Sequence, residues 1–152
     1  MLVRPQPEQL MIEAKGKLWE YPASWRCITT NATINSSGYL VMGKSCALEA
    51  KQRFPLLPKK LGEWVLAYGN RPFLCRGEGL ITFPTKTSWR DLSNALLIRE
   101  SANKIRDLAD KFSLRDIVMP RPGCGCGGLT WDFVKPYIED VLDNRFTVLE
   151  NK

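Results

Sequence analysis

Apolar residues along the chain follow two patterns, helical spacing and short continuous runs. Between residues 91 and 112 they recur at alternating intervals of three and four, which predicts a long amphipathic helix. Two further helices are expected over residues 45–54 and 58–68, because Ser45 can cap the first and Pro58 suits the first turn of the second. Each helix has one apolar face, so each should pack against another layer.

Short apolar runs that end at turn-forming residues predict six strands, over residues 11–14, 25–29, 73–75, 80–83, 116–119 and 146–149. Thr130 can cap a last helix that reaches residue 142, where Pro136 should produce a kink or mark the true start. Strands and helices thus alternate along the chain, which predicts an α/β layered domain. In such domains the binding loops follow the carboxyl ends of strands.

The composition fits a single globular domain over residues 1–152, because 44% of the residues are hydrophobic and 25% are charged. No run reaches the roughly 18 apolar residues of a membrane span, and the N-terminal segment lacks the apolar stretch of a signal peptide. We therefore expect a cytoplasmic protein with no membrane partner. The formal net charge of +6 favours an anionic partner, although a solvated basic surface explains it equally well.

Two cysteines lie one residue apart in the glycine-rich stretch RPGCGCGGLTW, at residues 121–131. A metal site would need more ligands, but the sequence has no histidine, and the other cysteines lack the spacing of structural zinc sites: Cys27, Cys46 and Cys75. The C-x-C spacing also differs from the C-x-x-C of thioredoxin-type redox sites. We therefore expect no metal, no cofactor and a loop that holds a ligand. The five cysteines are odd in number and their spacing suggests no disulfide framework, so reduced thiols are the simpler expectation.

Residues 38–45 match the P-loop pattern G-x-x-x-x-G-K-S. Residues 31–37 separate this segment from its strand, and bulky residues occupy positions 39–42, where the backbone must approach phosphates. No apolar run ends in an aspartate that could hold magnesium. A P-loop nucleoside triphosphatase is therefore the less favoured alternative function.

The stretch at residues 121–131 leads from an expected strand into a helix N-terminus. Glycines let backbone N–H groups turn toward a ligand without obstruction by Cβ atoms, and the helix dipole adds partial positive charge. This combination suits a pyrophosphate or a phosphoribose. A plain glycine turn would explain one such loop, but two loops of the same character favour a binding site.

An ordered set of segments resembles the macrodomain family, and the resemblance covers residues 11–149: KGKLW (15–19), ITTNA (28–32), GYLVMGKSCALEAKQRFP (38–55), FPTKTSW (83–89) and MPRPGCGCGGLTW (119–131). It is strongest to bacterial and phage macrodomains related to DNA ADP-ribosyl glycohydrolase antitoxins. It implies a three-layer α/β/α fold with a central mixed sheet. It also implies ADP-ribose or a related nucleotide as ligand, and ADP-ribosylated DNA or protein as candidate substrates.

The resemblance further implies which residues form the site. Lys86 and Asn31 are the candidate catalytic residues, with Asn31 in contact with the distal ribose. Two loops would enclose the pyrophosphate without a metal or a triphosphate, which gives the glycines of the P-loop pattern another role. The implied ligand-binding residues are Lys17, Leu18, Gly38, Val41, Met42, Gly43, Lys44, Gly123, Cys124, Gly125, Cys126, Gly127, Gly128 and Leu129.

The sequence departs from the family pattern at two of these positions. Lys17 stands where many macrodomains carry an acidic residue that binds the adenine amino group, and a lysine can only donate hydrogen bonds. A ligand with another base or an extra phosphate therefore stays open. Cys126 stands where relatives often carry asparagine.

Two roles are open for Lys86. A free lysine has a pKa of about 10.4, so a nucleophilic Lys86 must be partly desolvated or lie near another cation, with Lys44 and Lys17 as candidates. A protonated Lys86 could instead orient a phosphate or the ribose. Accordingly, the chain is expected to be either an ADP-ribosyl glycohydrolase or a module that sequesters ADP-ribose without turnover.

Overall fold

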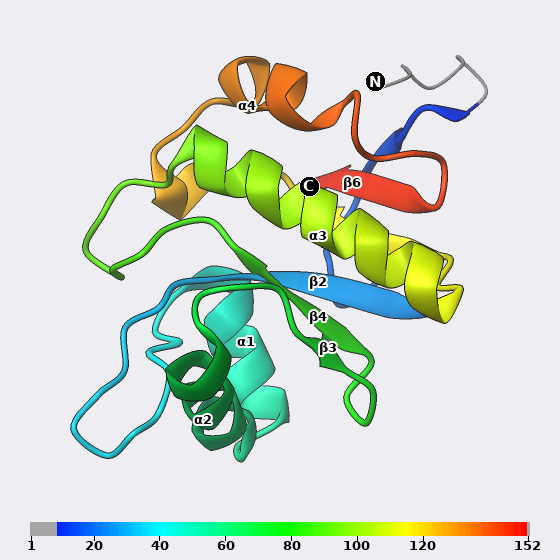
Figure 1. The fold of residues 1–152 in the computed structure, drawn as a ribbon. Coiled ribbons are helices and arrows are strands. Elements are labelled where there is room, and N and C mark those ends of the chain that lie inside the picture. The colour runs from blue at the N-terminus through cyan, green and yellow to red at the C-terminus, as the bar shows by residue number, and fades with distance from the viewer. Residues whose placement is uncertain (1–8, 152) are drawn as a thin grey trace.

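The computed structural model describes residues 9–151 and contains one six-stranded sheet in the order β1-β6-β5-β2-β4-β3 (Figure 1). Neighbouring strands pair in parallel except β3, which runs antiparallel to β4. The mixed sheet is therefore confirmed. Its strands are β1 (Ile12–Lys15), β2 (Trp25–Thr30), β3 (Leu74–Cys75), β4 (Leu80–Pro84), β5 (Ile117–Pro120) and β6 (Phe146–Glu150).

Helices cover both faces of the sheet, which confirms the three-layer α/β/α architecture. Helices α1 (Ser45–Arg53) and α2 (Leu57–Tyr68) lie on one face, and α3 (Ala95–Phe112) and α4 (Trp131–Ile138) lie on the other (Figure 1). The side chains of successive strand residues point to opposite faces of the sheet, so they pack against different helix layers. On β2, for example, Cys27 packs with the residues beneath α3 and α4, whereas Ile28 packs with those beneath α1 and α2.

Helix α3 begins later than its apolar spacing predicts. The helix starts at Ala95, because Asn94 is the N-cap and its Oδ1 accepts hydrogen bonds from the backbone N–H groups of Leu96 and Leu97 at 2.9 and 3.1 Å. The predicted start at residue 91 was therefore wrong. Leu92, which has the right spacing for a buried position, is 71% exposed and belongs to the preceding loop.

Two other helix predictions need correction. Ser45 does not cap α1: the N-cap is Lys44, which makes no side-chain capping bond, and Ser45 has a φ of +52°. Helix α4 ends at Ile138 and not at residue 142, two residues after Pro136, which removes a helical hydrogen bond and crowds the preceding turn. Thr130 does cap α4 as predicted, since its Oγ1 accepts from the backbone N–H of Phe133.

Residues 1–8 and 152 lie outside the described part of the chain, so the full domain extent stays a prediction at both ends. None of the helices within residues 9–151 combines the length and apolar character that crossing a bilayer requires.

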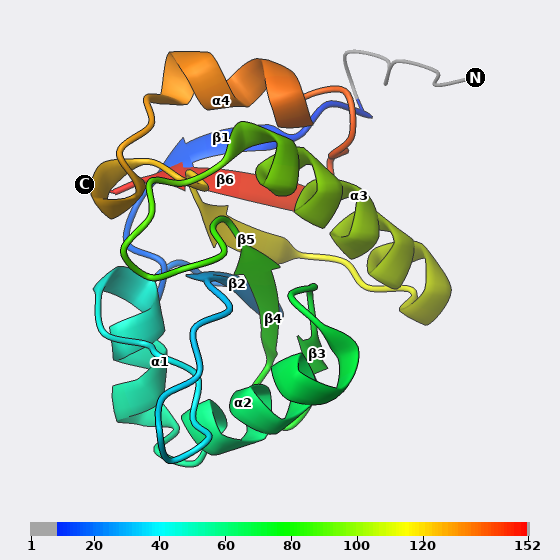
Figure 2. The same ribbon diagram turned by 60° about the vertical axis from the view of Figure 1, so that its left-hand side comes forward.

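The carboxyl ends of the five parallel strands meet at one edge of the sheet, toward which β1 points left in Figure 2. The residues that directly follow these strands are Gly16, Asn31, Thr85, Arg121 and Asn151. In open α/β sheets this edge is where ligands bind, because loops from several strands converge there.

Candidate functional site

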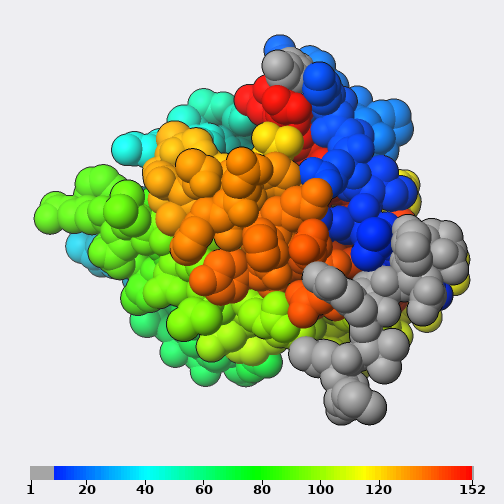
Figure 3. Space-filling view, turned by 90° about the horizontal axis from the view of Figure 1, so that it is seen from above, coloured from blue at the N-terminus to red at the C-terminus, as the bar shows by residue number. Residues whose placement is uncertain are grey.

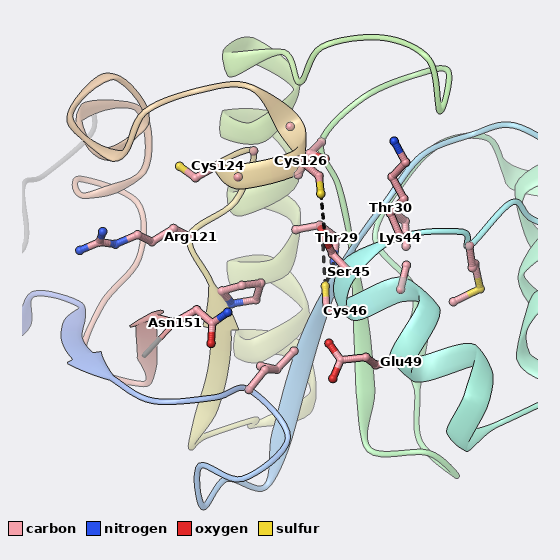
Figure 4. A pocket seen from close by; sticks show the side chains of 18 of the residues that line it. Thr29, Thr30, Lys44, Ser45, Cys46, Glu49, Arg121, Cys124, Cys126 and Asn151 are labelled. Carbon is pink, nitrogen blue, oxygen red and sulfur yellow. Dashed lines mark hydrogen bonds between the residues drawn. The ribbon is translucent and has the colours of Figure 1, made fainter.

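A cavity of about 940 Å³ opens at this edge of the sheet (Figure 4). Its volume lies near the upper end of the roughly 300–1,000 Å³ that is usual for small-ligand pockets. The lining comes from α1 with the loop before it, and from the carboxyl end of every parallel strand or the segment that follows it. The lining residues are 16–20, 29–31, 41–47, 49, 53, 85, 86, 89, 93, 120, 121, 123–127 and 149–151. Sequence segments far apart in the chain therefore contribute to one site.

Most of the residues that the sequence predicted as site residues line this cavity. The two candidate catalytic residues, Asn31 and Lys86, are among them. The others that line it are Lys17, Leu18, Val41, Met42, Gly43, Lys44, Gly123, Cys124, Gly125, Cys126 and Gly127. Three predicted residues lie outside the lining, namely Gly38, Gly128 and Leu129.

Asn31 fixes the loop that follows β2. Its side chain is 9% exposed; Nδ2 donates to the carbonyl oxygen of Val41 at 3.1 Å, and Oδ1 accepts from the backbone N–H of Thr33 at 2.8 Å. An amide side chain has four hydrogen-bonding positions, so Asn31 retains capacity for a ligand. The same residue thus positions the first loop and faces the cavity.

The first loop runs from residue 38 to residue 44 and packs closely on α2. A Cβ atom at Gly62 would lie 2.0 Å from the carbonyl oxygen of Gly38, so only glycine at position 62 allows this approach. Leu40 donates its backbone N–H to Pro58 at 2.9 Å. Gly38 lies in the turn at the outer end of this loop, where its N–H donates to the carbonyl oxygen of Asn35. At Gly43, no atom lies within 4 Å of the position that a Cβ atom would occupy.

The second loop, residues 123–129, is closed by its own backbone. Leu129 donates to the carbonyl of Gly123, and Gly128 donates to that of Gly125, both at 3.0 Å. All three glycines have φ between +72° and +81°, a conformation that side chains with a Cβ atom rarely adopt. Leu129 packs against the core and Gly128 against Leu92, which is why these two predicted residues do not line the cavity.

Two buried polar atoms at the cavity lack a hydrogen-bond partner among the described residues. They are Ser93 Oγ, on a residue that is 8% exposed, and Trp19 Nε1. Ser93 lies directly beneath the second loop, because its N–H donates to the carbonyl of Gly127 at 2.9 Å. Buried polar groups in proteins are nearly always paired, so these two atoms are available to a polar ligand or a water molecule in the cavity.

Two thiols at the cavity have different environments (Figure 4). Cys126, in the second loop, is exposed, and its Sγ lies 3.2 Å from the Ser45 hydroxyl at the start of α1. Cys46 is buried, its Sγ accepts from the backbone N–H of Thr29 at 3.4 Å, and burial raises the pKa of its thiol. Cys46 therefore stays protonated and is not a nucleophile at neutral pH.

The charges around the cavity include both signs. Five cationic side chains line it: Lys17, Lys44, Arg53, Lys86 and Arg121. Three glutamates also line it: Glu20, Glu49 and Glu150. Figure 4 shows the Glu49 carboxylate turned from α1 into the cavity, whereas the guanidinium of Arg121 points away from it. The site can therefore hold a polyanion and still offer a carboxylate acceptor.

Among residues 9–151, no group of three or more His, Cys, Asp and Glu side chains is arranged to hold a metal ion.

No protein-family model matches the chain. A DNA ADP-ribosyl glycohydrolase of Thermus aquaticus is 31% identical over 121 residues, covering 73% of this chain and 33% of that protein. The solved macrodomain of Thermus aquaticus DarG matches with a TM-score of 0.74 at 27% identity, over 93% of this chain and 98% of that structure. The chain is a macrodomain, and it is related to that of DarG.

A further structure matches this macrodomain, that of Thermosipho africanus DarTG in complex with ADP-ribose. Its TM-score is 0.74 at 18% identity, over 99% of this chain and 44% of that one, which supports the fold. The chain spans about a third of the length of the curated relatives it matches, 33% of the Thermus aquaticus protein and 34% of a fusion protein of Thermosipho africanus.

Sequence reasoning missed several cavity residues of this macrodomain. Ser93 was assigned to the long helix, because the apolar spacing continues through residues 91–94 and hides the Asn94 cap. Glu49 and Trp89 lay inside segments that resembled the family, but neither residue was singled out. Glu49 could have been predicted from its position, because it lies in the first two turns of a helix that begins directly after the first loop.

Proposed function

We propose that this macrodomain binds ADP-ribose and hydrolyses ADP-ribosyl linkages, with ADP-ribosylated DNA as its substrate. One observation carries the proposal: two glycine loops and an α1 N-terminus converge on a single cavity in a chain similar to DNA ADP-ribosyl glycohydrolases. Thermosipho africanus DarTG, part of which has a similar fold, was solved in complex with ADP-ribose. A cytoplasmic location, expected from the sequence, belongs to the same proposal.

The diphosphate of ADP-ribose would lie between the two loops. The first turn of α1 offers backbone N–H groups there, because its N-cap, Lys44, makes no side-chain capping bond. The dipole of the helix and the ammonium group of Lys44 both favour an anion at this point. Gly43 has no Cβ atom, and the position that a Cβ atom would occupy has no other atom within 4 Å, so the first loop can approach the phosphates closely there.

The adenine base needs an acceptor for its amino group, which Lys17 cannot supply. Glu49 fits this role, because its exposed carboxylate turns into the cavity and makes no hydrogen bond or ion pair among those found for the described residues (Figure 4). The proposed ligand is therefore ADP-ribose itself. Because position 17 is a lysine in this chain, the residue that accepts the hydrogen bond from the adenine amino group is Glu49 in this proposal.

Catalysis is assigned to Lys86 with Asn31. A neutral Lys86 amine would attack the anomeric carbon of the distal ribose as the bond to the acceptor breaks, and the acceptor would leave with a proton. Water would then displace Lys86 and release ADP-ribose. Asn31 would hold the ribose hydroxyls with the hydrogen-bonding capacity that its loop contacts leave over.

One observation favours the binding-only alternative. The second loop, residues 123–129, contains no carboxylate that could act as a general acid or base. A module that holds ADP-ribose without turnover would need only the loops and the cationic side chains.

The experiment that tests the proposal uses a single-stranded oligonucleotide that carries ADP-ribose on one base. Incubation with the wild-type macrodomain should release free ADP-ribose and restore the unmodified oligonucleotide, measured by chromatography and mass spectrometry. Tight binding of the modified oligonucleotide without any release would favour the sequestering module.

A further inference from the structure

The loop between β4 and α3 presents an exposed tryptophan at the rim of the cavity. Trp89 is 42% exposed and lines the cavity, and the guanidinium of the neighbouring Arg90 lies 5.1 Å from the centre of a Trp89 ring. The space-filling view shows this loop, in green, projecting from the body of the protein (Figure 3).

Trp89 has no part in the hydrophobic core. The chain has five tryptophans, and the other four pack against one of the two core clusters: Trp25 and Trp131 against one, Trp19 and Trp64 against the other. Trp89 appears in neither cluster. Ligand cavities are lined mainly by hydrophobic and aromatic side chains, so an aromatic ring that lines the cavity and belongs to neither core cluster is placed to contact a ligand or partner.

Hydrogen bonds hold the backbone that carries this ring. Ser88 and Asp91 close a turn around it: the N–H of Ser88 donates to Asp91 Oδ2 at 3.1 Å, and the N–H of Asp91 donates to the carbonyl of Ser88 at 3.0 Å. The N–H of Trp89 also donates to Thr33 Oγ1 at 3.0 Å. Trp89 is therefore anchored to the segment that follows Asn31, and it lies three residues after Lys86 on the same loop.

We infer that Trp89, with Arg90 against its ring, stacks a nucleobase of the acceptor strand and so selects nucleic acid over protein as the ADP-ribosylated acceptor. The inference rests on the proposed function, because it places the acceptor beyond the anomeric carbon, next to Lys86. Every nucleobase has a flat π face that stacks on tryptophan, and arginine adds a cation–π contribution.

The charge of this rim agrees with a nucleic-acid strand. The loop of residues 85–94 carries two cations, Lys86 and Arg90, against one carboxylate, Asp91, and the whole chain carries a formal net charge of +6. Phosphates on either side of the stacked base would meet these cations, as in proteins that bind single strands through aromatic platforms and basic grooves. An acidic peptide would match the charge but has no base to stack on the ring.

The test compares two substrates, ADP-ribosylated single-stranded DNA and an ADP-ribosylated protein, and follows the ratio of their release rates. Trp89→Ala should lower the DNA-to-protein ratio by about tenfold or more, the size expected for loss of one stacked base. Trp89→Phe should restore most of the ratio, because phenylalanine keeps a stacking face. Phe133→Ala, which removes another exposed aromatic outside the cavity, should leave the ratio at its wild-type value.

Each other outcome has a separate meaning. An unchanged ratio in Trp89→Ala, or an equal loss on both substrates, would overturn the inference, as would a loss confined to the protein substrate. If the wild type releases ADP-ribose from neither substrate, the proposed hydrolysis fails, and the same ratio is then measured on the affinities for the two modified substrates. Thermal melting of each variant shows whether it folds like the wild type.

Discussion

The Ser45 hydroxyl lies 3.2 Å from Cys126 Sγ, so the start of α1 and the second loop meet across the cavity although 81 residues separate them. Ser45 has a φ of +52°, a left-handed conformation that is uncommon for a residue with a Cβ atom. This contact joins the start of α1, directly after the first loop, to the second loop. A ligand held in the cavity would lie against the exposed Cys126 thiol, because Cys126 is part of the lining.

That geometry predicts selective protection of Cys126. Iodoacetamide at pH 8 should alkylate Cys126 first, because Cys126 is exposed and burial raises the pKa of the other four thiols. The pKa of Cys75 is raised to about 12, and those of Cys27, Cys46 and Cys124 are raised as well, so these thiols stay protonated. ADP-ribose should slow the labelling of Cys126 by at least fivefold, measured by peptide mass spectrometry. Equal labelling rates with and without ADP-ribose would place the ligand away from the second loop.

Gly43 is the position for testing the phosphate site without disturbing the fold. Gly43→Val adds a branched side chain where nothing lies within 4 Å, so the variant should melt like the wild type and bind ADP-ribose at least tenfold more weakly by calorimetry. Gly127→Val is less suitable, because its Cβ would lie 2.3 Å from Ser93 Oγ and would displace the loop itself.

The matched control for Gly43 is Gly77→Val. At Gly77, too, no atom lies within 4 Å of the position that a Cβ atom would occupy. Gly77 lies outside the cavity, in the turn between β3 and β4. This variant should bind ADP-ribose with wild-type affinity. If Gly43→Val does the same, the first loop does not hold the phosphates.

Base selection should depend on Glu49. The wild type should bind ADP-ribose at least tenfold more tightly than the analogue with hypoxanthine in place of adenine, because a hydrogen bond to a charged group contributes about 1.5–3 kcal/mol. Glu49→Gln should reduce this preference, and Glu63→Gln, an exposed glutamate on α2 outside the cavity, should preserve it. A preference that survives in Glu49→Gln would show that another residue reads the base.

Lys86 separates catalysis from binding. If Lys86 acts in the transition state, Lys86→Ala should lose most release of ADP-ribose from modified DNA while its affinity for free ADP-ribose changes little. If Lys86 only pairs with a phosphate, the affinity should instead fall by about 1.5–3 kcal/mol. Lys86→Arg should bind and not turn over, because arginine cannot be deprotonated to become a nucleophile. Wild-type rates in Lys86→Arg would refute the nucleophilic role.

The layered fold could be predicted from the sequence because each element carries its own signal. Runs such as residues 117–119 are buried in the sheet, and Thr130 caps the helix that its position predicted. The start of α3 could not be predicted from apolar spacing, since Leu92 fits the helical pattern yet lies in the loop. There the Asn94 side chain, a local hydrogen-bonding group, decides where the helix begins.

The candidate site was predictable only where glycines or family motifs marked it. The cysteines in GCGCGG gave no hint of Ser45, because the contact between Ser45 and Cys126 depends on how two loops meet in space. Ser93 and Trp89 depend on tertiary structure in the same way: one lies beneath Gly127, and the other is anchored to Thr33.

The measurement that tests the central claim most directly is a thermal-shift comparison of ADP-ribose with ATP and magnesium on the wild-type protein. A ligand at 100 times its Kd stabilises the native state by about 2.7 kcal/mol, which corresponds to a rise in Tm of about 5–10 °C for a domain of this size. We predict such a rise with ADP-ribose and none with ATP and magnesium. A magnesium-dependent rise with ATP, and no rise with ADP-ribose, would contradict the account and restore the P-loop interpretation of residues 38–45.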